Sequence, residues 1–200
     1  MYVPGMADEL PTAARRITDA LALSALAHPL RRRLLDLLKV HGPATVGLLA
    51  ERSGEAVGSA SHHLRVLAKA ELIEEAPELA RDRRERWWRL TAAEVRWARG
   101  DFTGDPAAAA AHEAAGSLLL ERQFALLRSW AARSAGYPEP WREGCAMSAE
   151  TWLRLTPGEA REFNAQLLAL IDSWASRTVP ADGAARESVL VVGHTVPAAP

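Results

Sequence analysis

The chain has 200 residues, of which 48% are hydrophobic, and a formal net charge of −1 at pH 7. This composition supports a packed core, and it excludes a chain that is disordered throughout or coated with positive charge. No apolar run approaches the roughly 20 residues of a membrane-spanning helix, and residues 1–10 lack the basic and apolar segments of a secretory signal. We therefore expect a cytoplasmic protein without a membrane partner.

Charge divides the chain into two parts. Residues 1–100 contain 16 basic and 13 acidic side chains, whereas residues 101–200 contain 8 and 12. The glycine- and aspartate-rich segment 100–105 is predicted to be a linker between them. The sequence therefore predicts an N-terminal domain at 1–100 and a C-terminal region at 101–200.

Four helices are predicted in the N-terminal domain. The first covers about 12–27, and the second, 29–42, starts with a proline, which suits a first helical turn because it has no N–H to lose. The third covers 46–52 and is capped by Thr45. The fourth, about 57–70, repeats apolar residues at helical spacing.

An arginine-rich hairpin follows these helices. Short strands are predicted at 72–75 and 86–90, joined by a connection at 76–85 in which Asp82 and Glu85 are expected to shape the loop. A second arginine run, at 31–33, is predicted to be a solvated helix face with at most one or two phosphate contacts. Four arginines fall within six residues at the hairpin tip: Arg81, Arg83, Arg84 and Arg86.

The segment 45–90 has the order helix, tight turn, helix and hairpin, which is that of a winged helix-turn-helix. The second helix of this motif enters the major groove of DNA, so its first turns need small residues that form hydrogen bonds. An arginine-rich hairpin tip contacts the DNA backbone or a narrow minor groove. His63 is equally consistent with packing behind the helix. The residues predicted to contact DNA are Thr45, Ser59, Ser61, His62, His63, Arg65, Arg81, Arg83, Arg84 and Arg86.

Four segments of this region resemble the ArsR/SmtB family of winged-helix repressors: AHPLRRRLL at 27–35, SHHLRVL at 61–67, AELI at 70–73 and RWWRL at 86–90. The resemblance covers roughly residues 18–91. It implies a homodimer that binds a palindromic operator in double-stranded DNA and responds to a small signal, such as a small-molecule effector. Family members usually carry polar residues where this chain has Val57 and Gly58, so base readout is expected to depend on Ser59, Ser61, His62 and the hairpin.

Metal sensing, which the resemblance suggests, has no ligand set in this sequence. No cysteine precedes Cys145, so the family's paired-cysteine motif is missing, and His112 and His194 lack further ligands at suitable spacing. No metal or other cofactor is expected. An enzyme is not predicted either, because the sequence has no glycine-rich phosphate loop, nucleophile elbow or paired carboxylates.

The C-terminal region is predicted to be a helical dimerisation region with a short two-stranded sheet. Helices are expected at 106–133 and after a capping box that starts at Thr156. The segment 151–155 alternates like a strand, and 188–192 is β-branched and apolar, so the two are predicted to pair, and 136–143 is predicted to be a loop. The side chains predicted to form the dimer seam are Ile17, Leu21, Leu120, Phe124 and Leu127.

Tryptophans leave two interpretations of the C-terminal region open. Trp130, Trp152 and Trp174 could line a pocket for an apolar effector, or they could fill the core of a small helical subdomain. Earlier in the chain, Trp87 or Trp88 is expected to anchor the hairpin in the core.

These patterns predict a mainly α fold with a small β wing, in which a winged helix-turn-helix precedes the C-terminal helical region. The predicted function is a sequence-specific DNA-binding transcriptional regulator, a repressor. The alternative is a winged-helix module that binds another protein, or that binds DNA architecturally without strong sequence specificity.

Overall fold

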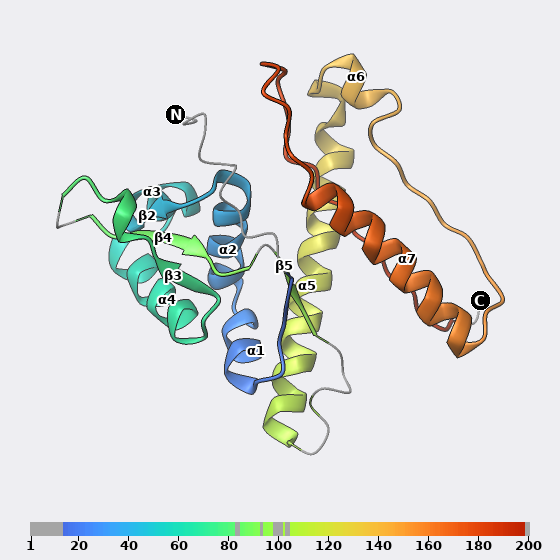
Figure 1. The fold of residues 1–200 in the computed structure, drawn as a ribbon, viewed down its shortest axis with the longest axis horizontal. Coiled ribbons are helices and arrows are strands. Elements are labelled where there is room, and N and C mark those ends of the chain that lie inside the picture. The colour runs from blue at the N-terminus through green and yellow to red at the C-terminus, as the bar shows by residue number, and fades with distance from the viewer. Residues whose placement is uncertain (1–13, 83–84, 93, 98–101, 103–104, 199–200) are drawn as a thin grey trace. The chain divides into compact units, whose positions relative to one another are not determined.

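The computed structural model describes residues 14–82, 85–92, 94–97, 102 and 105–198 (Figure 1). The chain forms two compact units, Met1–Leu120 and Glu121–Pro200, and the long helix α5 (Pro106–Arg133) contributes residues to both. In the part of the chain that the structure describes, no helix combines the length and the apolar character that crossing a membrane requires.

The N-terminal unit opens with a strand and a short helix instead of the long helix predicted at 12–27. β1 (Ala14–Arg16) precedes α1 (Ala20–Leu26), which begins where the Asp19 carboxylate accepts the Ala22 N–H at 2.7 Å. The helix prediction was therefore correct for 20–26 and wrong for 14–19, because an aspartate that caps a helix also marks where the helix starts.

β1 pairs in parallel with β5 (Glu94–Arg96), a strand that the sequence analysis did not predict. The pairing continues at Ile17, whose N–H donates to the Arg96 carbonyl at 2.8 Å. The Ile17 side chain is completely buried in the core of its own unit. This corrects its predicted place in a dimer seam, because a side chain without exposed surface cannot contact a second chain.

Three helices confirm the remaining helix predictions for this unit: α2 (Pro29–His41), α3 (Val46–Ser53) and α4 (Val57–Lys69). Thr45 caps α3 as predicted. Gly54 follows α3 in the left-handed conformation, with a φ of 72°, which allows the sharp turn into α4.

A three-stranded antiparallel sheet has the order β2–β4–β3. β3 (Ile73–Glu75) and β4 (Trp87–Leu90) form the predicted hairpin, and β2 (Ala44–Thr45) pairs with the other edge of β4. A 3₁₀ turn, η2 (Pro77–Leu79), begins the connection between β3 and β4. Trp88 is buried and is the predicted anchor of the hairpin.

The core of the N-terminal unit includes residues from the helices α1–α4, the sheet and the first half of α5. Ala108 and Ala115 of α5 are buried in it, and so is Phe102, although the segment 100–105 was predicted to be a linker. Arg32 is also buried, so its arginine run is not wholly the solvated face that was predicted. The large side chains that are fully buried are Ile17, Leu23, Leu26, Leu34, Leu38, Leu49, Leu64, Leu67 and Ile73.

The C-terminal unit consists of the second half of α5, η4 (Ser134–Gly136), α6 (Glu139–Arg142) and α7 (Pro157–Ala175). α5 has the predicted bounds, whereas the short helix α6 lies in a segment predicted to be a loop. The predicted capping box of α7 is present, since the Thr156 Oγ1 accepts the Glu159 N–H and the Glu159 carboxylate accepts the Thr156 N–H. None of the described side chains at 121–198 is buried.

The strand pair predicted for the C-terminal unit is not formed. The segments 151–155 and 188–192 have no regular secondary structure. In each of them, neighbouring side chains are both exposed, as in Trp152 with Leu153 and Val189 with Leu190. A two-stranded ribbon is marginal unless one face packs on a core, and the described residues of this unit supply no such core.

Candidate nucleic-acid interface

α3 and α4 form a helix-turn-helix (Figure 1). One side of α4 is apolar and buried, and the opposite side is exposed. The inner side is buried and consists of Ala60, Leu64 and Leu67. The opposite side is exposed and consists of Gly58, His62, Arg65 and Lys69. These four exposed residues, called the α4 outer face below, follow one another at i, i+4, i+7 and i+11, so they share one stripe of the helix.

Two predicted DNA contacts lie beside the α4 outer face. Ser59 and Ser61 are half-buried, and the Ser61 hydroxyl accepts a hydrogen bond from Arg65 Nη2 at 3.1 Å. The bond joins residues one helical turn apart. The structure therefore brings Ser61 and Arg65 together, next to the exposed His62.

α4 begins without a side-chain cap. Its N-cap residue, Ala56, has no side-chain oxygen that could accept the first N–H groups, and Val57 after it is exposed. In the neighbouring helix α3, by contrast, the Thr45 Oγ1 accepts the Leu48 N–H at 3.3 Å, so a DNA contact by this hydroxyl stays a prediction. The first N–H groups of α4 carry the positive end of the helix dipole, where an anionic group such as phosphate is favourable.

The side chain of His63 does not belong to the α4 outer face but packs against the residue that precedes α2. Its ring centroid lies 4.4 Å from that of His28, the N-cap residue of α2, and 5.2 Å from that of His62. Burial lowers the pKa of His63, the positive charge of His28, Arg31 and His62 lowers it further, and Glu55 raises it. Of the two positions that the sequence left open for His63, the ring occupies the packing one.

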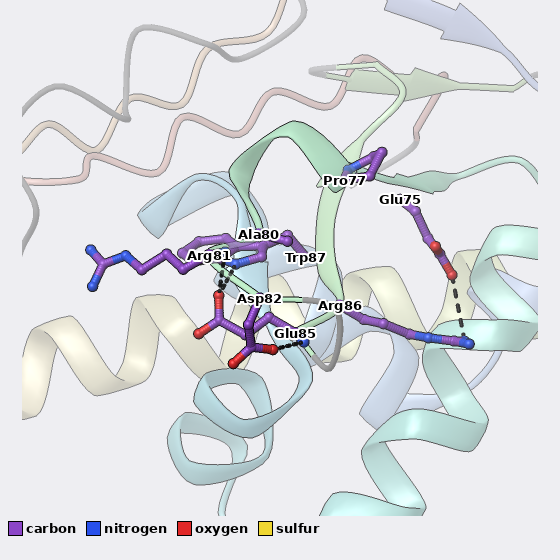
Figure 2. Close-up of a pocket in the computed structure, with 8 residues that line it drawn as sticks. All are labelled: Glu75, Pro77, Ala80, Arg81, Asp82, Glu85, Arg86 and Trp87. Atoms are coloured by element: carbon purple, nitrogen blue, oxygen red, sulfur yellow. Dashed lines mark hydrogen bonds and ion pairs between the residues drawn. The ribbon is translucent and has the colours of Figure 1, made fainter.

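Two carboxylates shape the hairpin between β3 and β4 (Figure 2). The Glu85 carboxylate accepts the Arg81 N–H at 3.0 Å and Trp87 Nε1–H at 3.2 Å, and these bonds hold the pKa of Glu85 below its ordinary value. The Asp82 carboxylate accepts the Glu85 N–H at 3.2 Å. Both acidic residues therefore shape the loop, as the sequence analysis expected.

Arg81 and Arg86 leave the hairpin in opposite directions, beside a shallow open pocket (Figure 2). Arg86 Nη1 forms an exposed ion pair with Glu75 Oε1 at 3.5 Å. The Arg81 guanidinium points to solvent. Arg83 and Arg84 lie outside the described residues, so their DNA contacts stay predictions. Arg81 could meet a phosphate as it stands, whereas Arg86 would have to exchange Glu75 for one.

Arg15 fastens the C-terminal end of α4, a role that sequence reasoning missed. Its guanidinium donates to the carbonyls of Ala70, at 3.2 Å, and of Glu71, and it lies 3.4 Å from the Glu71 carboxylate. Glu71 has a φ of 54°, and the Thr91 hydroxyl donates to its carbonyl at 2.7 Å. These contacts join β1 and the end of the hairpin to the helix that would enter DNA, and no local sequence signal marks them.

The tryptophans of the C-terminal unit are not completely buried. Trp130 packs edge-on against Tyr137, with ring centroids 4.9 Å apart. The Arg177 guanidinium lies 5.1 Å from the Trp174 ring. Trp152 and Trp174 are 63% and 64% exposed. A place in a core is therefore wrong for Trp152 and Trp174, whereas Trp130 is half-buried and an effector pocket at these residues stays a prediction.

Part of the predicted dimer seam is an exposed stripe on α5. Leu120, Phe124 and Leu127 are 41%, 54% and 45% exposed and follow one another at i, i+4 and i+7. Leu21 of α1 is exposed as well. The described residues leave this stripe of α5 uncovered, which is unusual for large apolar side chains that share one side of a helix.

Residues 26–76 match a family of helix-turn-helix domains. The transcriptional repressor SdpR of Bacillus subtilis (strain 168) is 47% identical over 49 residues, which make up 24% of this chain and 53% of SdpR, so the match spans about half of that repressor. A similar solved structure is the homodimeric winged helix-turn-helix DNA-binding domain (fragment 1–100) of Mb0332 from Mycobacterium bovis, a possible ArsR-family transcriptional regulator. It is 22% identical, with a TM-score of 0.33, and the alignment covers 61% of this chain and 85% of that one. The family match covers α2, β2, α3, α4 and β3.

Proposed function

We propose that this chain, whose residues 26–76 match a helix-turn-helix family, is a transcriptional regulator of the ArsR type that binds a specific sequence in double-stranded DNA. It acts as a homodimer on a palindromic operator and represses transcription by covering the promoter.

The α4 outer face is the observation that carries this proposal. The major groove of DNA admits an α-helix, and Gly58 at the start of the stripe allows the helix backbone to approach closely. His62 and Arg65 can donate hydrogen bonds to base edges, and Lys69 can reach a phosphate. The uncapped N–H groups at Val57 and beyond add a phosphate contact at the start of the helix.

The hairpin supplies a second contact beside α4. Arg81 extends from it into solvent (Figure 2), and an arginine at this position lies along the DNA backbone or enters a narrow minor groove. A winged helix that binds only another protein has no need of this arginine or of small residues at the start of α4. These two features favour DNA over a protein partner.

The exposed α5 stripe supports the homodimer. A second copy of Leu120, Phe124 and Leu127 would cover the first by a two-fold axis, in the way that self-complementary apolar helices associate. The two α4 helices of such a dimer would enter successive major grooves, with half-sites about one turn of DNA apart.

A genomic-fragment selection tests the proposed function. The purified full chain is mixed with sheared genomic DNA at moderate salt, and the retained DNA is sequenced. We expect a palindrome with half-sites about one helical turn apart. Retention that is sensitive to salt but independent of sequence would favour the architectural alternative, and no retention at any salt concentration would favour the protein-interaction module.

A further inference from the structure

A pair of histidines lies behind the α4 outer face, where the proposed DNA contacts do not use it. We propose that His28 and His63, while both are neutral, hold α4 in position, and that protonation of this pair displaces α4 and lowers the sequence specificity of DNA binding. The inference rests on the proposed function, because it concerns the regulation of the same helix.

The pair joins two helices that are distant in sequence. His28 is the N-cap residue of α2 and His63 lies in α4, and their ring centroids are 4.4 Å apart with the planes tilted by 38°. Both residues are half-buried, and the buried Nδ1 of His63 has no hydrogen-bond partner among the described residues. A contact at this distance between two imidazoles is favourable when both are neutral and repulsive when both are charged.

The N-cap of α2 requires His28 to be neutral. Its Nδ1 accepts the Leu30 N–H at 3.2 Å, so the ring proton lies on Nε2. A second proton on Nδ1 would turn this acceptor into a donor that faces the Leu30 N–H. Protonation of His28 therefore removes the cap of α2 and adds a positive charge at the positive end of that helix.

Arg31 fixes a positive charge beside both rings. Its guanidinium donates from Nε to the Ala25 carbonyl at 2.6 Å and from Nη2 to the Ser24 carbonyl at 2.7 Å, at the C-terminal end of α1. The bonds hold the charge of Arg31 near α2 and α4, where it cannot move away from a protonated histidine.

All but one of the groups around the pair lower the pKa values of the two histidines. Burial lowers the pKa of His28, and Arg31 and His62 lower it further. For His63, burial, His28, Arg31 and His62 all lower the pKa, and only Glu55, from the turn before α4, raises it. The surroundings contributed by α1, α2 and α4 therefore favour the neutral pair, and the opposing carboxylate lies in the turn.

Protonation has two separable effects on DNA binding. A more positive protein is attracted more strongly to any DNA, whatever its sequence. A displaced α4, however, loses the hydrogen bonds that read base edges, since these depend on a fixed position in the groove. The ratio of affinities for the selected site and for random DNA isolates the second effect from the first.

The test measures this ratio at pH 7.5 and at pH 5.5, at constant sodium concentration, with the selected fragment and a random duplex of equal length. Wild type is compared with His28→Asn/His63→Gln, in which asparagine keeps an N-cap acceptor and neither residue titrates. His41→Gln is the matched control, because His41 lies at the other end of α2. Histidine side-chain NMR without DNA follows the titration of His28 and His63 in the full chain.

We expect the wild-type and His41→Gln ratios to fall by about tenfold at pH 5.5, as for the loss of one hydrogen-bonded base contact, and the double variant to keep its ratio. A ratio that does not fall, or that falls equally in the double variant, overturns the proposal. If wild type prefers no sequence even at pH 7.5, the proposed function fails. The NMR titration then decides separately whether the pair is neutral behind α4, and titration of both rings above their ordinary pKa would exclude that as well.

Discussion

The two compact units differ in how much of their apolar surface their own residues cover. The N-terminal unit has a core of completely buried side chains from every helix α1–α4 and from the sheet, whereas the described part of the C-terminal unit buries no side chain. Burial of apolar surface is the main force that stabilises a folded domain. The N-terminal unit therefore has within itself what a stable fold requires, and the C-terminal unit depends on being covered, in our proposal by a second copy.

The largest expected effect contrasts one leucine from each unit. Leu64→Ala should lower the free energy of unfolding by about 2–5 kcal/mol, because it opens a cavity behind α4. Leu170→Ala, at an exposed position of α7, should cost less than about 0.5 kcal/mol in dilute solution. Urea denaturation followed by circular dichroism measures both. Equal losses would mean that the C-terminal unit has a core of its own.

A second contrast tests what covers the C-terminal unit. Phe124→Asp/Leu127→Asp should weaken the free energy of dimerisation by about 2 kcal/mol or more, since it places charges in the centre of the proposed seam. Met147→Asp changes an exposed apolar residue outside α5 and should leave assembly unchanged. Sedimentation equilibrium over a range of concentrations gives the constants. A wild-type chain that is monomeric at every concentration would remove the homodimer from the proposed function.

The N-terminal unit was also the more predictable of the two from sequence. Its helices α2 and α3 begin or end at residues with a local conformational preference, such as Pro29, Thr45 and Gly54. The pairing of β1 with β5 carries no such signal, because it joins short segments that are distant in the chain. In the C-terminal unit, alternation at 151–155 imitated a strand, but alternation has structural meaning only where one face is buried.

The contacts of the candidate site were also only partly predictable from the sequence. Ser61, His62 and Arg65 are close in sequence and occupy adjacent turns of one helix, so their proximity could be predicted. The contact of His63 with His28 and the capping of α4 by Arg15 depend on how distant segments pack, which a single sequence does not specify.

Substituting one arginine in each unit tests whether only the N-terminal unit contributes to DNA binding. Arg65→Ala should weaken binding to the selected site by about 1–3 kcal/mol and relax its sequence preference, because a base contact is lost. Arg161→Ala removes an exposed arginine of α7 and should leave both unchanged. Fluorescence anisotropy with selected and random duplexes provides the affinities. If Arg65→Ala weakened both duplexes equally, Arg65 would be a phosphate contact and α4 would have a different reading face.

Two further arginine substitutions compare how much a long-range contact and a local ion pair contribute to stability. Arg15→Ala should destabilise the N-terminal unit by about 1 kcal/mol, since it leaves the carbonyls at the end of α4 without their donor. Arg186 forms an ion pair with the nearby Asp182, at 2.8 Å and four residues away, and donates to the Ala184 carbonyl at 3.1 Å, so both contacts are local. Arg186→Ala should therefore produce no measurable change in the urea midpoint. A large effect at Arg186 would show that the C-terminal tail is held more firmly than its exposure indicates.

The smallest expected effect is a pH dependence confined to the N-terminal unit. The pKa values of His28 and His63 are lower in the folded chain than their ordinary value of 6.5, so the unfolded chain binds protons more readily. The stability that the neutral pair contributes is complete above about pH 6.5 and decreases as the pH falls toward the lowered pKa values. Thermal unfolding between pH 8 and pH 5 should show this decrease in wild type and in His194→Gln, whose histidine belongs to the C-terminal unit and bonds Gln123 at 2.9 Å. His28→Asn/His63→Gln should flatten the decrease, and an equally steep decrease in that variant would assign it to groups other than this pair.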